Sequence, residues 1–420
     1  MTTYPDSVQF LYTLGNEVRT VKLGLERIRA LLAALGNPQD GCRFVHVAGT
    51  NGKGSTCAMI EAALRQAGLK TGLFTSPHLV EPTERIRISG APVAREEFAR
   101  AFETVHGAAE ELLSRGLLDL HPTYFETVTA MAFVLFRQAG VECAALEVGL
   151  GGRLDATNLI QPAVAVITPV DFDHEAYLGR GLDAIAGEKA GILKAGAPAV
   201  IARQRREAEA ILCARAAELG VPLTRTADWR VEDLQLTAQA SAFTARGPRA
   251  YRIHCPLAGE HQVENALTAV AALDTLGIPP AAIEEGIPRA QWPGRLERVS
   301  ERPEIILDGA HNPAGARALA AHLERFYRHR SITLVYGAMR DKAVEESSGI
   351  LFPLAAEVVL TAPAQARAVR PETVREMTSH PRVRVAPRVA DALALARDAD
   401  LVVVAGSLFL VGEARALLVE

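Results

Sequence analysis

One segment near the start of the chain constrains the fold more than any other. Residues 43–75 contain a buried strand at 44–48, a glycine-rich turn, a helix at 55–66 and a second strand at 71–75. Strands joined by a crossover helix pair in parallel, and helices cover both faces of a parallel sheet. The segment therefore predicts an α/β fold with a mainly parallel sheet.

Further segments extend this pattern. Almost uninterrupted apolar runs at 144–148 and 163–168 predict two more buried parallel strands. Apolar residues at helical spacing predict amphipathic helices at 17–35, 125–138 and 182–193. Strands that alternate with helices in this way are typical of a doubly wound sheet.

Two later segments depart from the pattern. The stretch 212–254 alternates polar and apolar residues, which predicts a few antiparallel strands appended to the sheet. Regular periodicity stops at 286–294, where two prolines and two glycines occur. We expect a linker there, between a first domain at 1–285 and a smaller, Rossmann-like α/β domain at 295–420, in which strands and helices alternate again.

Charge and hydropathy exclude several classes of partner. The 45 basic residues are balanced by 49 acidic ones, so no positive field exists to hold a nucleic acid. The longest apolar run, 401–411, is interrupted by Gly406 and Ser407 and is too short to span a membrane. Because the first residues do not resemble a signal peptide, we expect a cytoplasmic protein. The five cysteines lack metal or redox spacing and are expected to be reduced thiols.

The turn after the first strand has the parts of a phosphate-binding loop. Glycines let backbone N–H groups approach an anion, Lys53 supplies a positive charge, and Ser55 offers a hydroxyl for Mg²⁺. The spacing departs from the strict G-x-x-x-x-G-K-[ST] pattern, because only two residues separate Gly49 from Gly52. A glycine-rich turn with an exposed lysine is the alternative, but the position between strand and helix favours a nucleotide. The loop consists of Gly49, Thr50, Asn51, Gly52, Lys53, Gly54 and Ser55.

Two more side chains are predicted at the same edge of the sheet. Glu147 ends a buried strand, where α/β proteins bind ligands, and is placed to hold the Mg²⁺ of a nucleotide. An ion pair between Glu147 and Arg153 is the alternative. The next strand ends in a polar segment that contains His174. Lys189 lies in a charged helical turn, and its spacing alone gives it no role.

The second predicted domain has a similar polar turn. Residues 308–313, which include Asp308 and His311, lie between a predicted strand and a predicted helix. Arg295 follows Gly294 in the chain and could reach a bound phosphate, although an ordinary surface arginine fits the sequence equally well.

Four motifs occur together and resemble those of the folylpolyglutamate synthase/dihydrofolate synthase family, which belongs to the Mur ligase superfamily. They are His46–Ser55, Thr75–Leu79, Glu147–Asn158 and Asp308–Pro313. The resemblance extends from about Lys22 to Gly412 and follows the family's order. It implies that 1–285 is a P-loop-containing, ATP-binding central domain and that 295–420 is a Mur ligase C-terminal-type domain.

The resemblance also implies an activity. A ligase of this family would transfer the γ-phosphate of ATP to a substrate carboxylate, after which the amino group of L-glutamate would displace phosphate from the acyl phosphate. Two acceptors are implied. One is tetrahydrofolate, which is a reduced folate, and the other is 7,8-dihydropteroate. Neither a nucleic acid nor a membrane is expected as a partner, and a monomer is expected.

By this resemblance, particular residues receive roles. The catalytic residues would be Lys53, Lys189 and His311. ATP would contact the 49–55 loop together with Asn265, Arg295 and Asp308. The Mg²⁺ positions would be Ser55, Ser76, Glu147, His174 and a carbamylated Lys189. The pterin would contact Gly24, Leu25, Glu26, Arg27, Thr123, Tyr124, Phe125, Glu126, Leu154, Asp155 and Ala156. An aromatic ring at Phe125 suits a flat heterocycle, but it would suit a core equally.

Two other functions remain as alternatives. Cell-wall amino-acid ligases share the ATP machinery but carry an additional N-terminal domain, and only 42 residues precede the first strand here. A nucleotide-dependent binding protein would need the phosphate loop alone. The presence of Glu147, His174, Lys189 and His311 argues against that second alternative.

Overall fold

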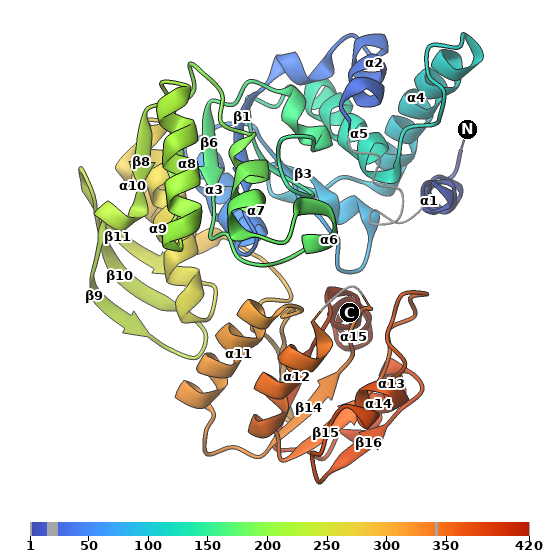
Figure 1. The fold of residues 1–420 in the computed structure, drawn as a ribbon, viewed down its shortest axis with the longest axis vertical. Helices are drawn as coiled ribbons and strands as arrows, with labels where there is room; N and C mark the ends of the chain where they lie inside the picture. The colour runs from blue at the N-terminus through green and yellow to red at the C-terminus, as the bar shows by residue number, and fades with distance from the viewer. Residues whose placement is uncertain (1, 15–23, 341–342, 420) are drawn as a thin grey trace. The chain divides into compact units, whose positions relative to one another are not determined.

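The computed structural model describes residues 2–14, 24–340 and 343–419. The chain forms two compact units, shown in Figure 1. Unit 1 comprises Met1–Val231, Thr244–Ile253 and Asn265–Ala290, and unit 2 comprises Glu232–Phe243, His254–Glu264 and Gln291–Glu420. The chain passes from unit 1 to unit 2 for the last time between Ala290 and Gln291, within the linker expected at 286–294. The two earlier segments of unit 2, Glu232–Phe243 and His254–Glu264, were not expected from the sequence.

Unit 1 is built on an eight-stranded sheet with the order β4-β3-β2-β5-β1-β6-β7-β8. The six strands β2-β5-β1-β6-β7-β8 are parallel to one another. At one edge of the sheet, β3 pairs antiparallel with β2, and β4 pairs antiparallel with β3. The mainly parallel sheet expected from the sequence is therefore confirmed. The strands are β1 (Arg43–Ala48), β2 (Thr71–Phe74), β3 (Ile86–Ile88), β4 (Ala91–Pro92), β5 (Cys143–Glu147), β6 (Val164–Ile167), β7 (Ala199–Ile201) and β8 (Leu223–Arg225).

Helices cover this sheet and bury its central strands. One apolar cluster includes Phe44 of β1 and Phe133, and a second includes Ile167 of β6, Ile185 and Leu212. Both clusters lie almost entirely out of contact with solvent, as nearly all-apolar parallel strands require. The helices are α1 (Tyr4–Thr13), α2 (Glu26–Ala34), α3 (Lys53–Gln66), α4 (Arg95–Ser114), α5 (Tyr124–Ala139), α6 (Glu175–Leu178), α7 (Leu182–Ala190), α8 (Arg206–Glu218), α9 (Glu260–Thr275) and α10 (Pro280–Gly286).

Two sequence-based boundaries in the first predicted domain are wrong. The helix expected at 17–35 begins only at Glu26, since Gly24 and Leu25 are not helical, and 17–23 lie outside the described residues. The antiparallel strands expected at 212–254 begin only at Arg230. Residues 206–218 form α8, because this alanine-rich run favours a helix, and β8 pairs in parallel with β7. The strands β9 (Arg230–Leu236), β10 (Ser241–Arg246) and β11 (Ala250–Cys255) form a separate three-stranded sheet.

Unit 2 has a six-stranded sheet with the order β12-β13-β17-β14-β15-β16. Its pairs are parallel except that β12 runs antiparallel along the edge, which agrees with the expected Rossmann-like winding. The strands are β12 (Glu297–Glu301), β13 (Glu304–Leu307), β14 (Ile332–Tyr336), β15 (Glu357–Leu360), β16 (Val383–Val385) and β17 (Leu401–Ala405). The helices are α11 (Pro313–Phe326), α12 (Val344–Leu351), α13 (Pro371–Glu376), α14 (Val389–Leu395) and α15 (Leu408–Leu418).

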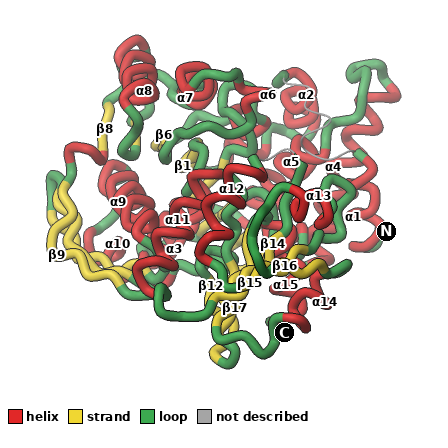
Figure 2. The backbone as a smooth tube through the Cα atoms, turned by 60° about the horizontal axis from the view of Figure 1, so that its bottom comes forward, coloured by secondary structure: helices red, strands yellow, loops and turns green. Residues whose placement is uncertain are grey.

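Two further features of the described chain bear on the site. In unit 1, α10 packs against α3, the helix that follows the phosphate loop. Both helices are labelled in Figure 2. Gly286 permits this contact because a side chain there would meet the backbone of Ala63. Among the helices that the structure describes, none has both the length and the apolar character to cross a bilayer.

Candidate active site

The phosphate loop connects β1 to α3 at the carboxyl end of the strand, and glycine is required at two of its positions. Gly49 has φ +148°, and a Cβ atom there would overlap the hydroxyl of Thr168. Gly52 has φ +84°, a left-handed value that disfavours side chains, and a Cβ atom there would overlap Asn265. The backbone of this loop therefore depends on glycine both for its torsions and for close packing.

Hydrogen bonds attach the loop to the segment that follows β6. The backbone N–H groups of Thr50 and Asn51 donate to the Pro169 carbonyl oxygen at 3.0 and 3.4 Å. The Thr50 hydroxyl donates to the Asp171 carbonyl oxygen at 2.9 Å. Lys53 Nζ donates to the Thr50 carbonyl oxygen at 3.2 Å, so the ammonium group folds back over the loop. These contacts hold the loop in one conformation beside the neighbouring strand end.

Glu147 lies at the carboxyl end of β5, the strand that pairs in parallel with β1. Its side chain is buried, and Oε2 accepts a hydrogen bond from the Ser76 backbone N–H at 3.1 Å. Ser76 follows β2, the other neighbour of β5. Arg153, the partner considered for Glu147, forms an ion pair with Glu188 at 2.8 Å. A buried carboxylate is thus present at the same edge of the sheet as the start of the phosphate loop.

Lys189 lies in the last turn of α7 and reaches the phosphate loop. Its Nζ donates to the Gly49 carbonyl oxygen at 2.8 Å, and the side chain is buried. Burial, reinforced by the positive charge of Lys53, lowers the pKa of the Lys189 amine to about 7. Asp173 and Asp155 oppose this shift by favouring the charged form. A substantial fraction of the amine is therefore neutral near pH 7.

Three more predicted residues approach this region. Ser55 is buried in the first turn of α3. Asn265 of α9 lies against Gly52. His174 caps α6 with a left-handed φ of 54°, and its Nε2 lies 3.9 Å from Asp173 Oδ1. Unit 1 therefore gathers lysine, carboxylate, hydroxyl and imidazole groups around one edge of the sheet.

The segments assigned to the pterin are joined by a polar contact. Arg27 Nε donates to Glu126 Oε2 at 3.1 Å, which links α2 to α5. Thr123 caps α5, because its hydroxyl accepts from the Glu126 N–H while the Glu126 carboxylate accepts from the Thr123 N–H. The other Glu126 oxygen, Oε1, is buried without a hydrogen-bond partner. A buried acceptor without a partner is uncommon in a folded protein.

Two aromatic residues next to this contact, Tyr124 and Phe125, pack against other parts of unit 1. Tyr124 is buried, with the Arg85 guanidinium 5.0 Å from its ring centroid. The Phe125 ring lies 5.8 Å from that of Phe74, and it covers Gly149 closely enough to exclude any side chain there. Phe125 thus packs next to the loop after β5. This position is compatible both with a core residue and with a surface for a flat heterocycle, the two roles considered from the sequence.

Asp155, in the 154–156 segment, organises the turn after β5. Its carboxylate accepts from the Leu150 N–H at 2.8 Å and from the Thr157 N–H at 3.0 Å. Burial raises the pKa of Asp155, although these hydrogen bonds oppose the rise. Leu154 and Ala156 flank it in the same turn. These bonds give the segment a structural role irrespective of any ligand.

The predicted residues of unit 2 surround the turn between β13 and α11. The Asp308 carboxylate accepts from the backbone N–H groups of Leu296 and Ala310, each at 2.9 Å. Burial raises the pKa of Asp308, and Arg295 opposes the rise. A Cβ atom at Gly309 would overlap the Arg295 guanidinium. His311 Nδ1 donates to the Gly309 carbonyl oxygen at 2.8 Å, which leaves Nε2 as the acceptor.

Sequence reasoning gave no role to Asp173, although this residue acts on the charge of Lys189. The only available signal was its place in the polar segment after β6, directly before His174. The Thr50–Pro169 contact was also missed, because it depends on the order of strands in the sheet and not on local spacing.

Family models match most of the chain. The Mur ligase middle domain matches residues 47–273, and the Mur ligase glutamate ligase domain matches residues 294–408. A dihydrofolate synthase/folylpolyglutamate synthase of Bacillus subtilis is 37% identical, over 81% of this chain and 81% of the relative.

Two other similarities concern a longer protein and a solved structure. A probable bifunctional folylpolyglutamate synthase/dihydropteroate synthase of Haloferax volcanii is 38% identical over 98% of this chain, which spans about half (50%) of that relative. The structure of Escherichia coli FolC in complex with DHPP and ADP is similar with a TM-score of 0.87 and 33% identity, covering 99% of each chain.

Proposed function

This chain belongs to the dihydrofolate synthase/folylpolyglutamate synthase family of Mur ligases, and we propose that it uses ATP to join L-glutamate to the carboxylate of a folate-type acceptor. The observation that carries the proposal is the convergence of the phosphate loop, buried Glu147 and buried Lys189 at one edge of the unit 1 sheet. The E. coli relative was solved with ADP and DHPP, which supports a nucleotide and a folate-type molecule as ligands here.

The first chemical step would activate the acceptor. A carboxylate oxygen attacks the γ-phosphorus of ATP, the bond to the ADP oxygen breaks, and an acyl phosphate forms. Both reactants are anions, so the protein must position them and neutralise charge. Lys53 would provide positive charge beside the transferred group, while the glycine-dependent loop would present backbone N–H groups to the phosphates.

The second step would form the amide. The glutamate amino group attacks the acyl carbon, phosphate leaves with its bridging oxygen, and the nitrogen loses a proton. His311 Nε2, with Nδ1 held by the Gly309 carbonyl, has the tautomer of a proton acceptor. We assign ATP contacts in unit 2 to Arg295 and Asp308. Asp308 would act mainly by holding the backbone around Arg295, since its carboxylate already accepts two backbone N–H groups.

The residues present fit Mg²⁺, which the family implies. Buried Glu147 supplies a carboxylate, and Ser55 and Ser76 supply hydroxyl oxygens, the hard ligands that this ion prefers. His174 would act through a water molecule, because imidazole is not a preferred Mg²⁺ ligand. When bound, the ion would neutralise charge on the phosphates. A Lys189 ammonium group would repel it, so Lys189 would have to lose its positive charge when the ion binds.

We propose that Lys189 is carbamylated in the active enzyme. Its neutral amine would add to CO₂ and lose one proton, which replaces an ammonium group with an anionic oxygen ligand. The buried position and the pKa of about 7 make the neutral amine available near neutral pH. Asp173 and Asp155 carry negative charge and therefore favour the charged amine. For the same reason they would repel the negatively charged carbamate. Coordination to Mg²⁺ would offset that repulsion.

We assign the acceptor to the surface formed by residues 24–27, 123–126 and 154–156. Arg27 and the Thr123 cap fix the Glu126 carboxylate, so Glu126 would help to shape this surface. Phe125 would offer a flat face. Asp155 is already occupied by backbone N–H groups and would shape the turn.

A phosphate-release assay with ATP and L-glutamate tests the function. Dihydropteroate and tetrahydrofolate are compared as acceptors, with a UDP-linked cell-wall precursor and no acceptor as controls. We expect release that depends on glutamate and on a folate-type acceptor. Release that depends only on the cell-wall precursor would support that alternative ligase. Nucleotide binding without turnover on any acceptor would support a binding protein.

A further inference from the structure

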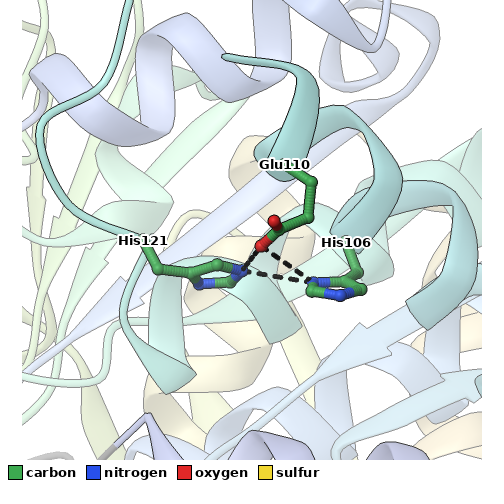
Figure 3. A group of neighbouring side chains, drawn as sticks. All are labelled: His106, Glu110 and His121. Carbon is green, nitrogen blue, oxygen red and sulfur yellow. Dashed lines mark hydrogen bonds and ion pairs between the residues drawn. The ribbon is translucent and has the colours of Figure 1, made fainter. Parts of the chain in front are cut away.

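A second cluster of metal-ligating side chains lies outside the candidate active site. His106 and Glu110 are one turn apart on the same face of α4, and His121 lies in the loop before α5. Figure 3 shows their side chains pointing toward one another. His106 Nδ1 lies 3.3 Å from His121 Nε2, and each of these nitrogens lies 3.9 Å from Glu110 Oε1.

These separations are close to those of a tetrahedral metal site. Zinc–nitrogen bonds of about 2.0–2.1 Å place two tetrahedral ligands about 3.4 Å apart. The two imidazole nitrogens already have this spacing. The Glu110 oxygen is somewhat farther away, but its side chain is 56% exposed and can rotate inward without repacking the core.

The imidazole rings are oriented by groups behind them. His121 Nδ1 donates to the Pro122 carbonyl oxygen at 2.8 Å, so the lone pair of Nε2 points into the cluster. The His106 ring is stacked on Phe102, with an interplanar angle of 9° and a centroid distance of 5.2 Å. Phe10 of α1 contacts the same ring at a centroid distance of 4.5 Å. Metal-binding histidines commonly have such supporting contacts.

We propose that His106, Glu110 and His121 bind a divalent transition-metal ion, for which Zn²⁺ is the best chemical match. Two imidazoles and one carboxylate suit zinc and its first-row neighbours, whereas Mg²⁺ and Ca²⁺ prefer oxygen ligands alone. Without the ion, His106 Nδ1 donates its proton to His121 Nε2. On binding, that proton moves to His106 Nε2 or to solvent, and both facing nitrogens become ligands.

The ion would add a contact between α4 and the loop at 115–123 that follows it. It would bind α4 to the loop that leads into the Thr123 cap of α5, which is close to the assigned acceptor surface. His106 is 29% exposed and His121 15% exposed, so the ion can enter from solvent. We therefore expect a stabilising contact at the start of α5, independent of the Mg²⁺ proposed for the phosphate loop.

Zinc titration of the full chain tests this site. The protein is first treated with a chelator and then titrated by calorimetry in excess Mg²⁺, which occupies the oxygen-rich sites. We expect one Zn²⁺ per chain and a rise in the thermal unfolding midpoint. His106→Gln and His121→Gln should each weaken binding by at least about tenfold. His254→Gln, at an exposed histidine in β11, is the matched control and should bind as the unmodified protein does.

Two further measurements keep the test decisive. The visible spectrum of the Co²⁺-loaded protein should show a tetrahedral, strongly absorbing centre that both histidine variants lose. Glu110→Gln changes an exposed residue, so it should fold normally and still lower zinc affinity. The proposal is overturned if the chain binds no Zn²⁺ under these conditions. It is equally overturned if one equivalent binds with unchanged affinity and spectrum in folded Glu110→Gln and histidine variants.

Discussion

Lys189 shows how much the chemistry of one side chain depends on tertiary contacts. Its neighbours in the sequence indicate a charged helical turn, which would be exposed on most helices. In the structure the side chain is buried and bonded to the Gly49 carbonyl. Local spacing could not predict this, because the contact joins residues 140 positions apart in the chain. Lys53 and Glu147, by contrast, could be singled out, since Lys53 lies in the glycine-rich turn after a strand and Glu147 lies at the end of one.

Replacement of Lys53 tests the charge assigned to the phosphate loop. Lys53→Ala should lower turnover by about 100-fold or more, because it removes the cation beside the transferred phosphoryl group. The thermal unfolding midpoint should change by less than about 2 °C, since the side chain supports little packing. Lys70→Ala, at an exposed lysine, is the control. Near-normal turnover in Lys53→Ala would exclude this residue from the mechanism.

Variants of Lys189 test the carbamate. Lys189→Ala should lose most activity, and acetate should restore part of it by supplying a carboxylate in the vacated space. Lys189→Arg should be equally inactive, because a guanidinium group keeps the charge but does not form a carbamate. Turnover with and without acetate provides the measurement. Full activity of the arginine variant would refute the assignment.

The shifted pKa of Lys189 also predicts a pH effect on stability in CO₂-free buffer. The folded pKa of about 7 lies below the ordinary value of 10.5, so the unfolded chain binds more protons between these two values. The free energy of unfolding should therefore rise with pH from about 7 to 10. Lys189→Met lacks this group, so the stability of the unmodified protein relative to Lys189→Met should increase over that range. A constant difference between the two unfolding curves would contradict the burial of a titrating amine.

At the scale of elements, the strand–loop–helix unit was predictable because it combines a buried strand, glycines and an amphipathic helix in one short segment. β1, α3 and β2 lie within two residues of their expected bounds. Part of α8 was mistaken for strand because its buried residues, Ala208, Leu212 and Ala216, form only a narrow apolar stripe. The metal cluster was hidden for another reason, since only the path of the loop brings His121 to α4.

Gly52 in the phosphate loop and Gly68 after the end of α3 can be compared, because they have nearly the same φ angle. Gly52 and Gly68 have φ of +84° and +85°, but a Cβ atom would overlap Asn265 at the first and meet nothing within 4 Å at the second. Each alanine variant should lose about 1–2 kcal/mol of stability from left-handed strain. Only Gly52→Ala should also weaken ADP binding, by at least about tenfold, because the loop must shift. Calorimetric titration with ADP measures this, and equal affinities in the two variants would contradict the described loop geometry.

At the scale of the whole molecule, the two α/β units were predictable, but the paths between them were not. The sequence indicated one linker, whereas the chain also enters unit 2 at 232–243 and 254–264. Short segments of this kind leave no change in composition or periodicity. The strand order was likewise beyond local patterns, and it is this order that places β5 beside β1 and so Glu147 beside the phosphate loop.

The proposed ligation requires that the acceptor carboxylate be activated as an acyl phosphate. The most direct measurement uses an acceptor labelled with ¹⁸O in the reacting carboxylate, together with ATP and L-glutamate, and determines the mass of the phosphate released. We expect one ¹⁸O atom in each phosphate and one in the new amide, because the bridging oxygen leaves with phosphorus. Amide formation with unlabelled phosphate would contradict it.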